Sequence, residues 1–184
     1  PGLVLGTASD RYAGWIGQIY TRELWAKGVT RRTKTVGGKA FLEAILPVAS
    51  VQEYFEHFGT LELDFTFYMP LRDGKGEPTR VYHLLRAYSQ HLHDGDRLVL
   101  KAPQTIFAKH LYRQGDYVEN KDYLNPEVFI RQFYEPALEV LAPWLDAIVF
   151  EQEHQKKESR VSPRETGAAM EAFFKAIPAD DRYQ

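Results

Sequence analysis

The stretch Leu61-Glu62-Leu63-Asp64-Phe65-Thr66-Phe67-Tyr68 alternates apolar and polar side chains from its first residue to its last. An alternation of period two is typical of a β-strand, in which successive side chains point to opposite faces. We therefore expect a strand over residues 61–68. Its polar face would carry Glu62 and Asp64, two carboxylates on the same side of the sheet.

Three further apolar segments have the character of strands, and helical patterns separate them. Asn125 followed by proline, and a capping box that starts at Ser162, mark the beginnings of two helices. Pro47 and Pro136 predict breaks or kinks inside two others. The expected strands are residues 3–8, 97–102 and 147–152, and the expected helices are residues 39–58, 79–93, 125–141 and 162–177.

Strands that alternate with helices pair in parallel through crossover connections, so the expected fold class is α/β. Four such units make half of a TIM-type (β/α) barrel, which takes about 250 residues. An open flavodoxin-like parallel sheet is the alternative, but its central strands are almost continuously apolar. The polar face of residues 61–68 favours the barrel. We therefore expect residues 1–184 to form one incomplete barrel domain and to be a fragment of a longer chain.

An incomplete barrel leaves two sheet edges that need cover, because unpaired edges are templates for aggregation. We expect neither end strand of this sheet to have its barrel neighbour within the chain. The cover would come from a missing C-terminal half or from a second chain.

Composition excludes several classes of protein. The 184 residues contain no cysteine, which excludes disulfides, cysteine-ligated metals and thiol nucleophiles. The net charge of −2 makes a nucleic-acid partner unlikely, because nucleic-acid binders are usually basic. No apolar run approaches the ~18 residues of a membrane-spanning helix, so no membrane partner is expected. The absence of cysteine fits a reducing compartment, and we expect a cytoplasmic location.

Four residues are candidates for catalysis: Glu62, Asp64, Lys101 and Glu151. Paired carboxylates can divide acid and base roles, because their repulsion raises the pKa of one of them. Lys101 lies near the end of an apolar strand, so we expect it to pair with Glu62 or Asp64 rather than to stand alone. Glu151 ends the last strand, at the edge where TIM-barrel sites form. A purely structural ion pair remains the alternative for Lys101.

Candidate substrate-binding residues are three aromatic side chains and one histidine: Tyr12, Trp15, Tyr68 and His154. The acids Glu62, Asp64 and Glu151, with Glu153 and His154, contain ligand types that suit a metal ion. No metal-binding spacing such as His-Glu-x-x-His is present, so no metal site is assigned, and the cofactor is unknown.

Several segments occur in the order found in a known family. Together they resemble the YecE-like domain of unknown function over nearly the whole chain. The segments are Gly6-Thr7-Ala8-Ser9, Tyr12 with Trp15, Tyr54-Phe55-Glu56-His57-Phe58, Leu61-Glu62-Leu63-Asp64-Phe65-Thr66-Phe67-Tyr68, Leu98-Val99-Leu100-Lys101-Ala102 and Ala147-Ile148-Val149-Phe150-Glu151-Gln152. The resemblance implies a TIM-type barrel of which this chain is the first half, and no established reaction.

The chain departs from the family pattern at three places, and each departure adds an acid. Asp10 stands where the family often has tryptophan, and Asp64 stands where it usually has asparagine. The segment from Phe150 to Glu153 replaces Phe-Gln-Leu-Pro-Pro. The local charge of a site in this protein would therefore differ from that of the family.

Two function classes remain open. The first is an enzyme, a hydrolase or isomerase, acting on a small polar molecule that is sugar-like or phosphate-bearing, at the C-terminal ends of the strands. The second is a non-catalytic binding module that uses a basic and aromatic loop over residues 12–39. Residues 9–39 are expected to be mainly loop with one short helix. In either case we expect the basic run Arg31-Arg32-Thr33-Lys34 to be exposed and mobile.

Overall fold

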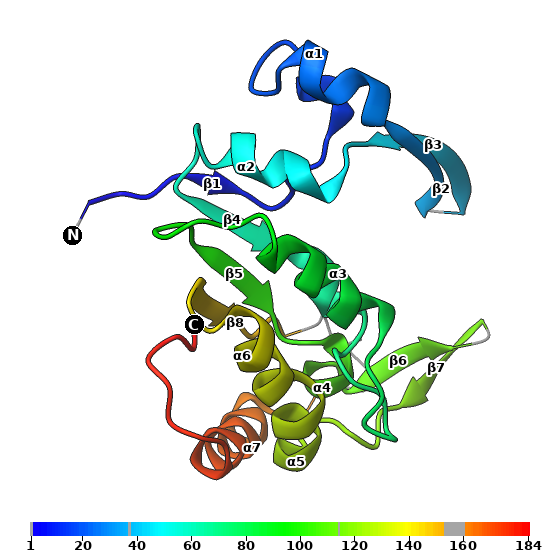
Figure 1. Cartoon of the computed structure of the whole chain (residues 1–184). Coiled ribbons are helices and arrows are strands. Elements are labelled where there is room, and N and C mark those ends of the chain that lie inside the picture. The colour runs from blue at the N-terminus through cyan, green and yellow to red at the C-terminus, as the bar shows by residue number, and fades with distance from the viewer. Residues whose placement is uncertain (1, 37, 114, 153–160) are drawn as a thin grey trace.

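A computed structural model describes residues 2–36, 38–113, 115–152 and 161–184. Its centre is a four-stranded parallel sheet whose strands stand side by side in chain order. The strands are β1 (Gly6–Thr7), β4 (Thr60–Leu63), β5 (Leu98–Lys101) and β8 (Leu145–Val149), and Figure 1 shows helices packed beside them. The expected α/β class with a parallel sheet is confirmed.

Seven α-helices are described along the chain, several of them a single turn long. They are α1 (Arg22–Trp25), α2 (Val51–Tyr54), α3 (Arg80–Ser89), α4 (Gln104–Phe107), α5 (Pro126–Phe129), α6 (Glu135–Leu141) and α7 (Pro163–Ala176). Short 3-10 segments cover Ala13–Trp15, Ala26–Gly28, Val48–Ser50 and Asp64–Tyr68. Helix α3 begins at Arg80, one residue after the start of the predicted segment 79–93, and ends earlier than predicted, at Ser89.

The two faces of the sheet are covered unequally. Leu61 and Leu63 of β4 are buried together with Leu98 and Leu100 of β5, in a core that includes residues of α3 and α6. The alternate residues of the same strands, among them Glu62 and Lys101, are only half-buried. The apolar core therefore lies on one side of the sheet, and the polar side chains of the strands face the other way.

Two antiparallel hairpins interrupt the α/β alternation. The first joins β2 (Thr30–Val36) to β3 (Lys39–Ile45), and the second joins β6 (His110–Arg113) to β7 (Asp116–Glu119). Both lie on the side toward which β4 and β5 point (Figure 1). The hairpins thus stand near the carboxyl ends of the parallel strands.

The β2–β3 hairpin corrects two sequence predictions. Residues 39–58 were expected to be one helix, and residues 9–39 mainly a loop. Instead Lys39–Ile45 pairs in register with Thr30–Val36, and Gly38 supports the turn with a positive φ of 77°. The apolar spacing of Phe41, Leu42 and Ile45 fits a helix and a strand equally, and pairing with the β-branched β2 decides between them.

The strand predicted over residues 61–68 is also shorter than its pattern. It ends at Leu63, and Asp64–Tyr68 turns into a 3-10 segment. The buried Thr66 hydroxyl accepts the backbone N–H of Lys101 at 3.0 Å and lies 2.8 Å from the Lys101 carbonyl oxygen. A side chain therefore satisfies backbone groups of β5 that a longer β4 would otherwise have paired.

The two helix starts that were predicted from capping residues are confirmed. Asn125 Oδ1 accepts the N–H groups of Glu127 and Val128, and Ser162 forms its capping box with Glu165, so both predicted caps are confirmed. The kink expected at Pro136 takes the form of a π-helical turn between α5 and α6. Pro136 has no N–H for the carbonyl four residues earlier, and the backbone N–H groups of residues 71 and 72 donate to that carbonyl instead.

The two sheet edges differ from each other. The last residues of the chain lie beside β8, where Tyr183 forms an isolated parallel bridge with Ile148 and so covers part of this edge. On the other side, only Gly6–Thr7 of the strand expected over residues 3–8 is formed, and Leu3, Val4 and Leu5 are exposed rather than buried. In the part of the chain that the structure describes, no strand pairs with the outer edge of β1.

Candidate functional site

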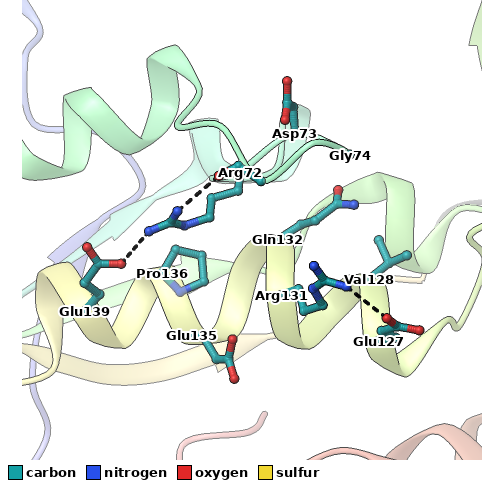
Figure 2. A pocket seen from close by; sticks show the side chains of 11 residues that line it. Arg72, Asp73, Gly74, Glu127, Val128, Arg131, Gln132, Glu135, Pro136 and Glu139 are labelled. Atoms are coloured by element: carbon teal, nitrogen blue, oxygen red, sulfur yellow. Dashed lines mark hydrogen bonds and ion pairs between the residues drawn. The ribbon is translucent and has the colours of Figure 1, made fainter.

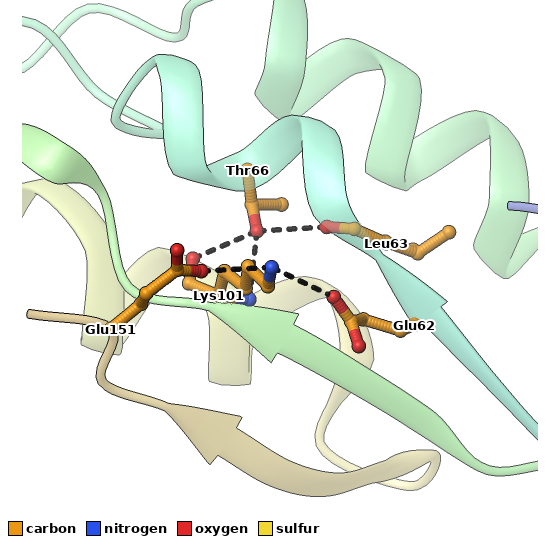
Figure 3. A network of polar contacts seen from close by, with 5 residues as sticks. All are labelled: Glu62, Leu63, Thr66, Lys101 and Glu151. Atoms are coloured by element: carbon orange, nitrogen blue, oxygen red, sulfur yellow. Dashed lines mark hydrogen bonds and ion pairs between the residues drawn. The ribbon is translucent and has the colours of Figure 1, made fainter. Parts of the chain in front are cut away.

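Lys101 is the centre of a charged network at the carboxyl ends of β4, β5 and β8. Its Nζ lies 3.2 Å from Glu62 Oε1 and 2.9 Å from Glu151 Oε2 (Figure 3). The predicted pairing of Lys101 with a carboxylate of the neighbouring strand is thus confirmed for Glu62. The hydrogen bond to Glu151, opposed by partial burial and reinforced by Glu62, raises the pKa of Lys101. The amine is therefore a stable ammonium and not a nucleophile.

Asp64 stands beside this network, but on the 3-10 segment instead of the strand. The expectation that Glu62 and Asp64 share one strand face is wrong, since β4 has ended before Asp64. Burial raises the pKa of Asp64; the negative charge of Glu62 raises it further, and the positive charge of Lys101 opposes both. Asp64 thus holds a proton more readily than an exposed aspartate does.

The β2–β3 hairpin brings basic side chains to the same edge. Arg32 Nε lies 2.7 Å from Glu43 Oε2, and Lys34 Nζ lies 3.6 Å from Glu43 Oε1. Although partial burial acts to raise it, the hydrogen bond and charge of Arg32 hold the pKa of Glu43 below its usual value. The exposure expected for Arg31-Arg32-Thr33-Lys34 is confirmed, but these residues form a strand and not a loop.

A second acidic group, which the sequence analysis did not select, lies at the end of β1. Asp10 is only 3% exposed, and its Oδ1 accepts the Tyr88 hydroxyl at 2.8 Å. Its Oδ2 is buried without a hydrogen-bond partner among the described residues. Burial, partly offset by the Tyr88 hydrogen bond, raises the pKa of Asp10 to about 6. The signal in the sequence was an aspartate placed directly after a short strand.

Asp10 lines a cavity of about 140 Å³ that joins four parts of the chain. Residues after β1, residues of the hairpin, Asp64 with Phe65, and helix α3 all contribute walls. The lining residues are Ser9, Asp10, Arg11, Tyr12, Arg32, Glu43, Ala44, Ile45, Asp64, Phe65, Leu84 and Tyr88. Because Asp64 also interacts with Lys101 and Glu62, the cavity and the Lys101 network adjoin each other.

The predicted substrate-binding residues are only partly brought together. Tyr12 is 57% exposed and lines the Asp10 cavity, where its ring contacts Trp15 edge-on at 5.9 Å between centroids. Trp15 stacks on Tyr20 and does not line the cavity. Tyr68 is exposed, contacts Phe67 and also lies outside the cavity lining. His154 lies outside the described residues.

A larger cavity, of about 470 Å³, lies between the loop before α3 and the helical segment from α5 to α6 (Figure 2). Its two arginines are already paired: Arg72 Nη2 lies 2.8 Å from Glu139, and Arg131 Nη1 lies 3.1 Å from Glu127. Arg131 and Glu127 are also strongly exposed to solvent. A candidate site needs polar groups that are free to bind a ligand. In the lining of this larger cavity, no described buried side-chain atom lacks a hydrogen-bond partner, so its size alone does not make it the candidate site.

The described residues contain no group of three or more histidine, cysteine, aspartate or glutamate side chains placed to hold a metal ion. Of the five residues weighed as metal ligands, Glu153 and His154 lie outside the described residues. The other three lie around Lys101, where the ammonium occupies the position between Glu62 and Glu151.

Compared with known proteins, the chain matches no family model, no curated protein and no solved structure. Within the described ranges, no helix combines the length and the apolar character needed to cross a membrane.

Proposed function

We propose that this protein is an enzyme that performs acid–base chemistry on a small polar molecule at the carboxyl ends of its parallel strands. The observation that carries the proposal is the position of the half-buried Asp64 beside the charged Lys101 network, where burial raises its pKa. A carboxyl group whose pKa is raised toward the working pH is suited both to take up and to release a proton. The substrate classes are sugar-like and phosphate-bearing molecules.

The residues take distinct roles in this proposal. Asp64 transfers the proton. Lys101 holds the Glu62 and Glu151 carboxylates in place with two of its three N–H groups and leaves one for a substrate oxygen. The two glutamates accept substrate hydroxyl groups, and Tyr12 offers an exposed ring for an apolar face of the substrate.

A TIM-type barrel and membership of the YecE-like family belong to the same proposal. The parallel strands follow chain order, as in a barrel, whereas a flavodoxin-like sheet has the order 2-1-3-4-5. The polar side chains of β4 and β5 lie on the face away from the apolar core, as the inward-facing residues of a barrel do. These two features support the barrel over the open sheet.

The test is turnover of a defined set of compounds. Neutral sugars, sugar acids and sugar phosphates are incubated with the protein and followed by proton NMR. We expect the wild type to convert at least one of them, and Asp64→Asn to lower the rate by at least about 100-fold, the usual contribution of a general acid or base. Asp146→Asn is the matched control, because Asp146 is exposed and lies in β8 away from the Lys101 network.

Two results contradict the enzyme proposal for these substrate classes. One is the absence of turnover of every compound in the set. The other is an Asp64→Asn variant that works at the rate of the wild type and of Asp146→Asn.

The binding-module alternative is favoured by one observation, the exposed surface of the β2–β3 hairpin. Phe41 and Leu42 are exposed on β3 and pair in register with Lys34 and Thr33 of the basic β2. An exposed apolar patch beside positive charge is typical of an interaction surface for an acidic partner. Loss of partner binding in a variant with Arg31→Gln and Lys34→Gln, with normal binding by Asp64→Asn, would support this alternative.

A further inference from the structure

The unpartnered oxygen of Asp10 distinguishes its cavity from the larger one between the loop before α3 and the α5–α6 segment, whose described lining has no such atom. A buried polar atom costs free energy unless it is hydrogen-bonded, and native proteins satisfy nearly all such atoms. Tyr88 satisfies Oδ1, but the described residues provide no donor for Oδ2. Asp10 lines the cavity but is only 3% exposed, and Oδ2 itself is closed off, so a ligand in the cavity can supply the missing donor when the side chain turns toward it.

The charged groups around the cavity indicate whether the hydrogen-bond donor of a ligand should be charged or neutral. The groups that act on Asp10 are the positive Arg11 and the hydroxyls of Tyr20, Tyr54 and Tyr88. Arg11 Nε is already engaged, because it donates to the Leu46 carbonyl oxygen at 2.6 Å.

The remaining charged groups of the lining are divided between the two signs. Arg32 is paired with Glu43, and Asp64 adds a second carboxyl group. A phosphate would meet the three acids Asp10, Glu43 and Asp64, and an ammonium ion would meet the guanidinium groups of Arg11 and Arg32. An uncharged hydroxyl group avoids both repulsions and still donates the hydrogen bond.

The size and walls of the cavity fit part of a sugar-like molecule. Its volume of about 140 Å³ exceeds the ~30 Å³ share of a single water molecule several times. Tyr12 and Phe65 provide aromatic surface in the lining, against which the apolar face of a sugar ring can pack.

We propose that the Asp10 cavity is a binding site for an uncharged, hydroxyl-rich molecule, one of whose hydroxyl groups donates to Asp10 Oδ2 once that side chain turns toward the cavity. As a substrate subsite this inference rests on the proposed function, and it selects the sugar-like class over the phosphate-bearing one. Binding itself does not require turnover.

The test measures binding and not activity. D-glucose, D-ribose and glycerol are the hydroxyl probes, inorganic phosphate and methylammonium are the charged probes, and saturation-transfer NMR and titration give the affinities. We expect at least one hydroxyl probe to bind the wild type. Asp10→Asn keeps the size of the side chain but can place a donor at the Oδ2 position, so we expect it to bind at least about tenfold more weakly.

Two further variants make the result specific. Glu127→Gln removes one negative charge at an exposed position outside the cavity and should bind the probe as the wild type does. Tyr12→Ala alters only an exposed ring of the cavity wall, so it should fold normally and weaken binding.

Four results would overturn the inference: no binding of any hydroxyl probe, preferred binding of phosphate or methylammonium, equal binding by Asp10→Asn and wild type, or a crystal structure grown with the probe that shows only an ordered water at Oδ2. Sugar binding that depends on Asp10, without turnover of any compound, would support this inference and reject the proposed function. Turnover of a sugar phosphate that depends on Asp64, without binding of the hydroxyl probes, would support the proposed function and reject this inference.

Discussion

Two acidic clusters meet at one edge of the sheet, and their carboxyl groups differ in burial and in the groups that pair with them. In the Lys101 network, Glu62 and Glu151 share a cation and remain partly open to solvent. In the Asp10 cavity, the carboxyl group is almost fully buried and has one neutral donor, Tyr88. The first arrangement raises the pKa of a lysine, and the second raises the pKa of an aspartic acid. The paired charges of the Lys101 network therefore stabilise this edge of the sheet, whereas the unpaired carboxylate of Asp10 lowers the stability of the fold.

The largest expected effect is at Asp10. Its pKa is 3.8 in the unfolded chain and about 6 in the folded protein, so folding favours the protonated form. Asp10 thus reduces the free energy of unfolding as the pH rises from 4 through 6, by about 3 kcal/mol in total. Asp10→Asn should remove this pH dependence and be more stable than the wild type at pH 7.5, as urea unfolding at several pH values will show.

The control for Asp10 is Glu127→Gln, which should leave the pH dependence between 4 and 6 unchanged. Equal pH profiles for wild type and Asp10→Asn would show that the Asp10 carboxyl titrates normally, and the contrast between the clusters would disappear.

The second largest change in the free energy of unfolding is expected at Thr66, whose hydroxyl holds the backbone of Lys101 in place. Its hydroxyl accepts the Lys101 N–H and lies within hydrogen-bond distance of the carbonyl oxygens of Lys101 and Leu63. Thr66→Val leaves buried backbone groups unsatisfied and should lower the free energy of unfolding by about 2 kcal/mol. Thr105→Val is the matched control, because the buried Thr105 hydroxyl has no partner among the described residues, and its loss should be nearly neutral.

The third largest change in the free energy of unfolding is expected when Lys101 itself is replaced. Lys101→Met leaves Glu62 and Glu151 close together without their cation, and we expect a loss of about 1–2 kcal/mol because all three side chains are partly exposed. The folded-state pKa of Lys101 is raised, so its stabilisation is complete below the unfolded pKa of 10.5 and is lost as the pH rises from there through the higher folded value. Unfolding curves at pH 7 and in strong alkali measure both effects, and no loss at pH 7 would contradict the network.

The smallest effect is expected at Arg32. Arg32→Gln removes an ion pair whose arginine is 59% exposed, so it should cost about 0.5 kcal/mol and less at high salt. Titration followed by NMR should also show the pKa of Glu43 returning toward its usual value, since Arg32 holds it down. A cost that does not change with salt would mean that Arg32 acts through packing rather than charge.

The sequence by itself determined the features that depend on neighbours along the chain. The caps at Asn125 and Ser162 follow from backbone N–H groups that a nearby side chain must satisfy, and both are present. The pairing of Lys101 was predictable as well, because a lysine between apolar residues of a strand requires a counter-charge. The parallel sheet was predictable from the order of the elements, because strands that alternate with helices pair in parallel through crossover connections.

Where a segment of sequence was compatible with two local structures, only the tertiary structure decided which of them was formed. Lys39–Ile45 became a strand because a partner strand was available, and β4 ended at Leu63 because the Thr66 hydroxyl satisfies the backbone of β5. The Asp10 cavity could not be seen in the sequence at all, because its walls come from segments that are far apart along the chain. Burial shifts the pKa of a carboxyl group, and burial depends on contacts that no local pattern specifies.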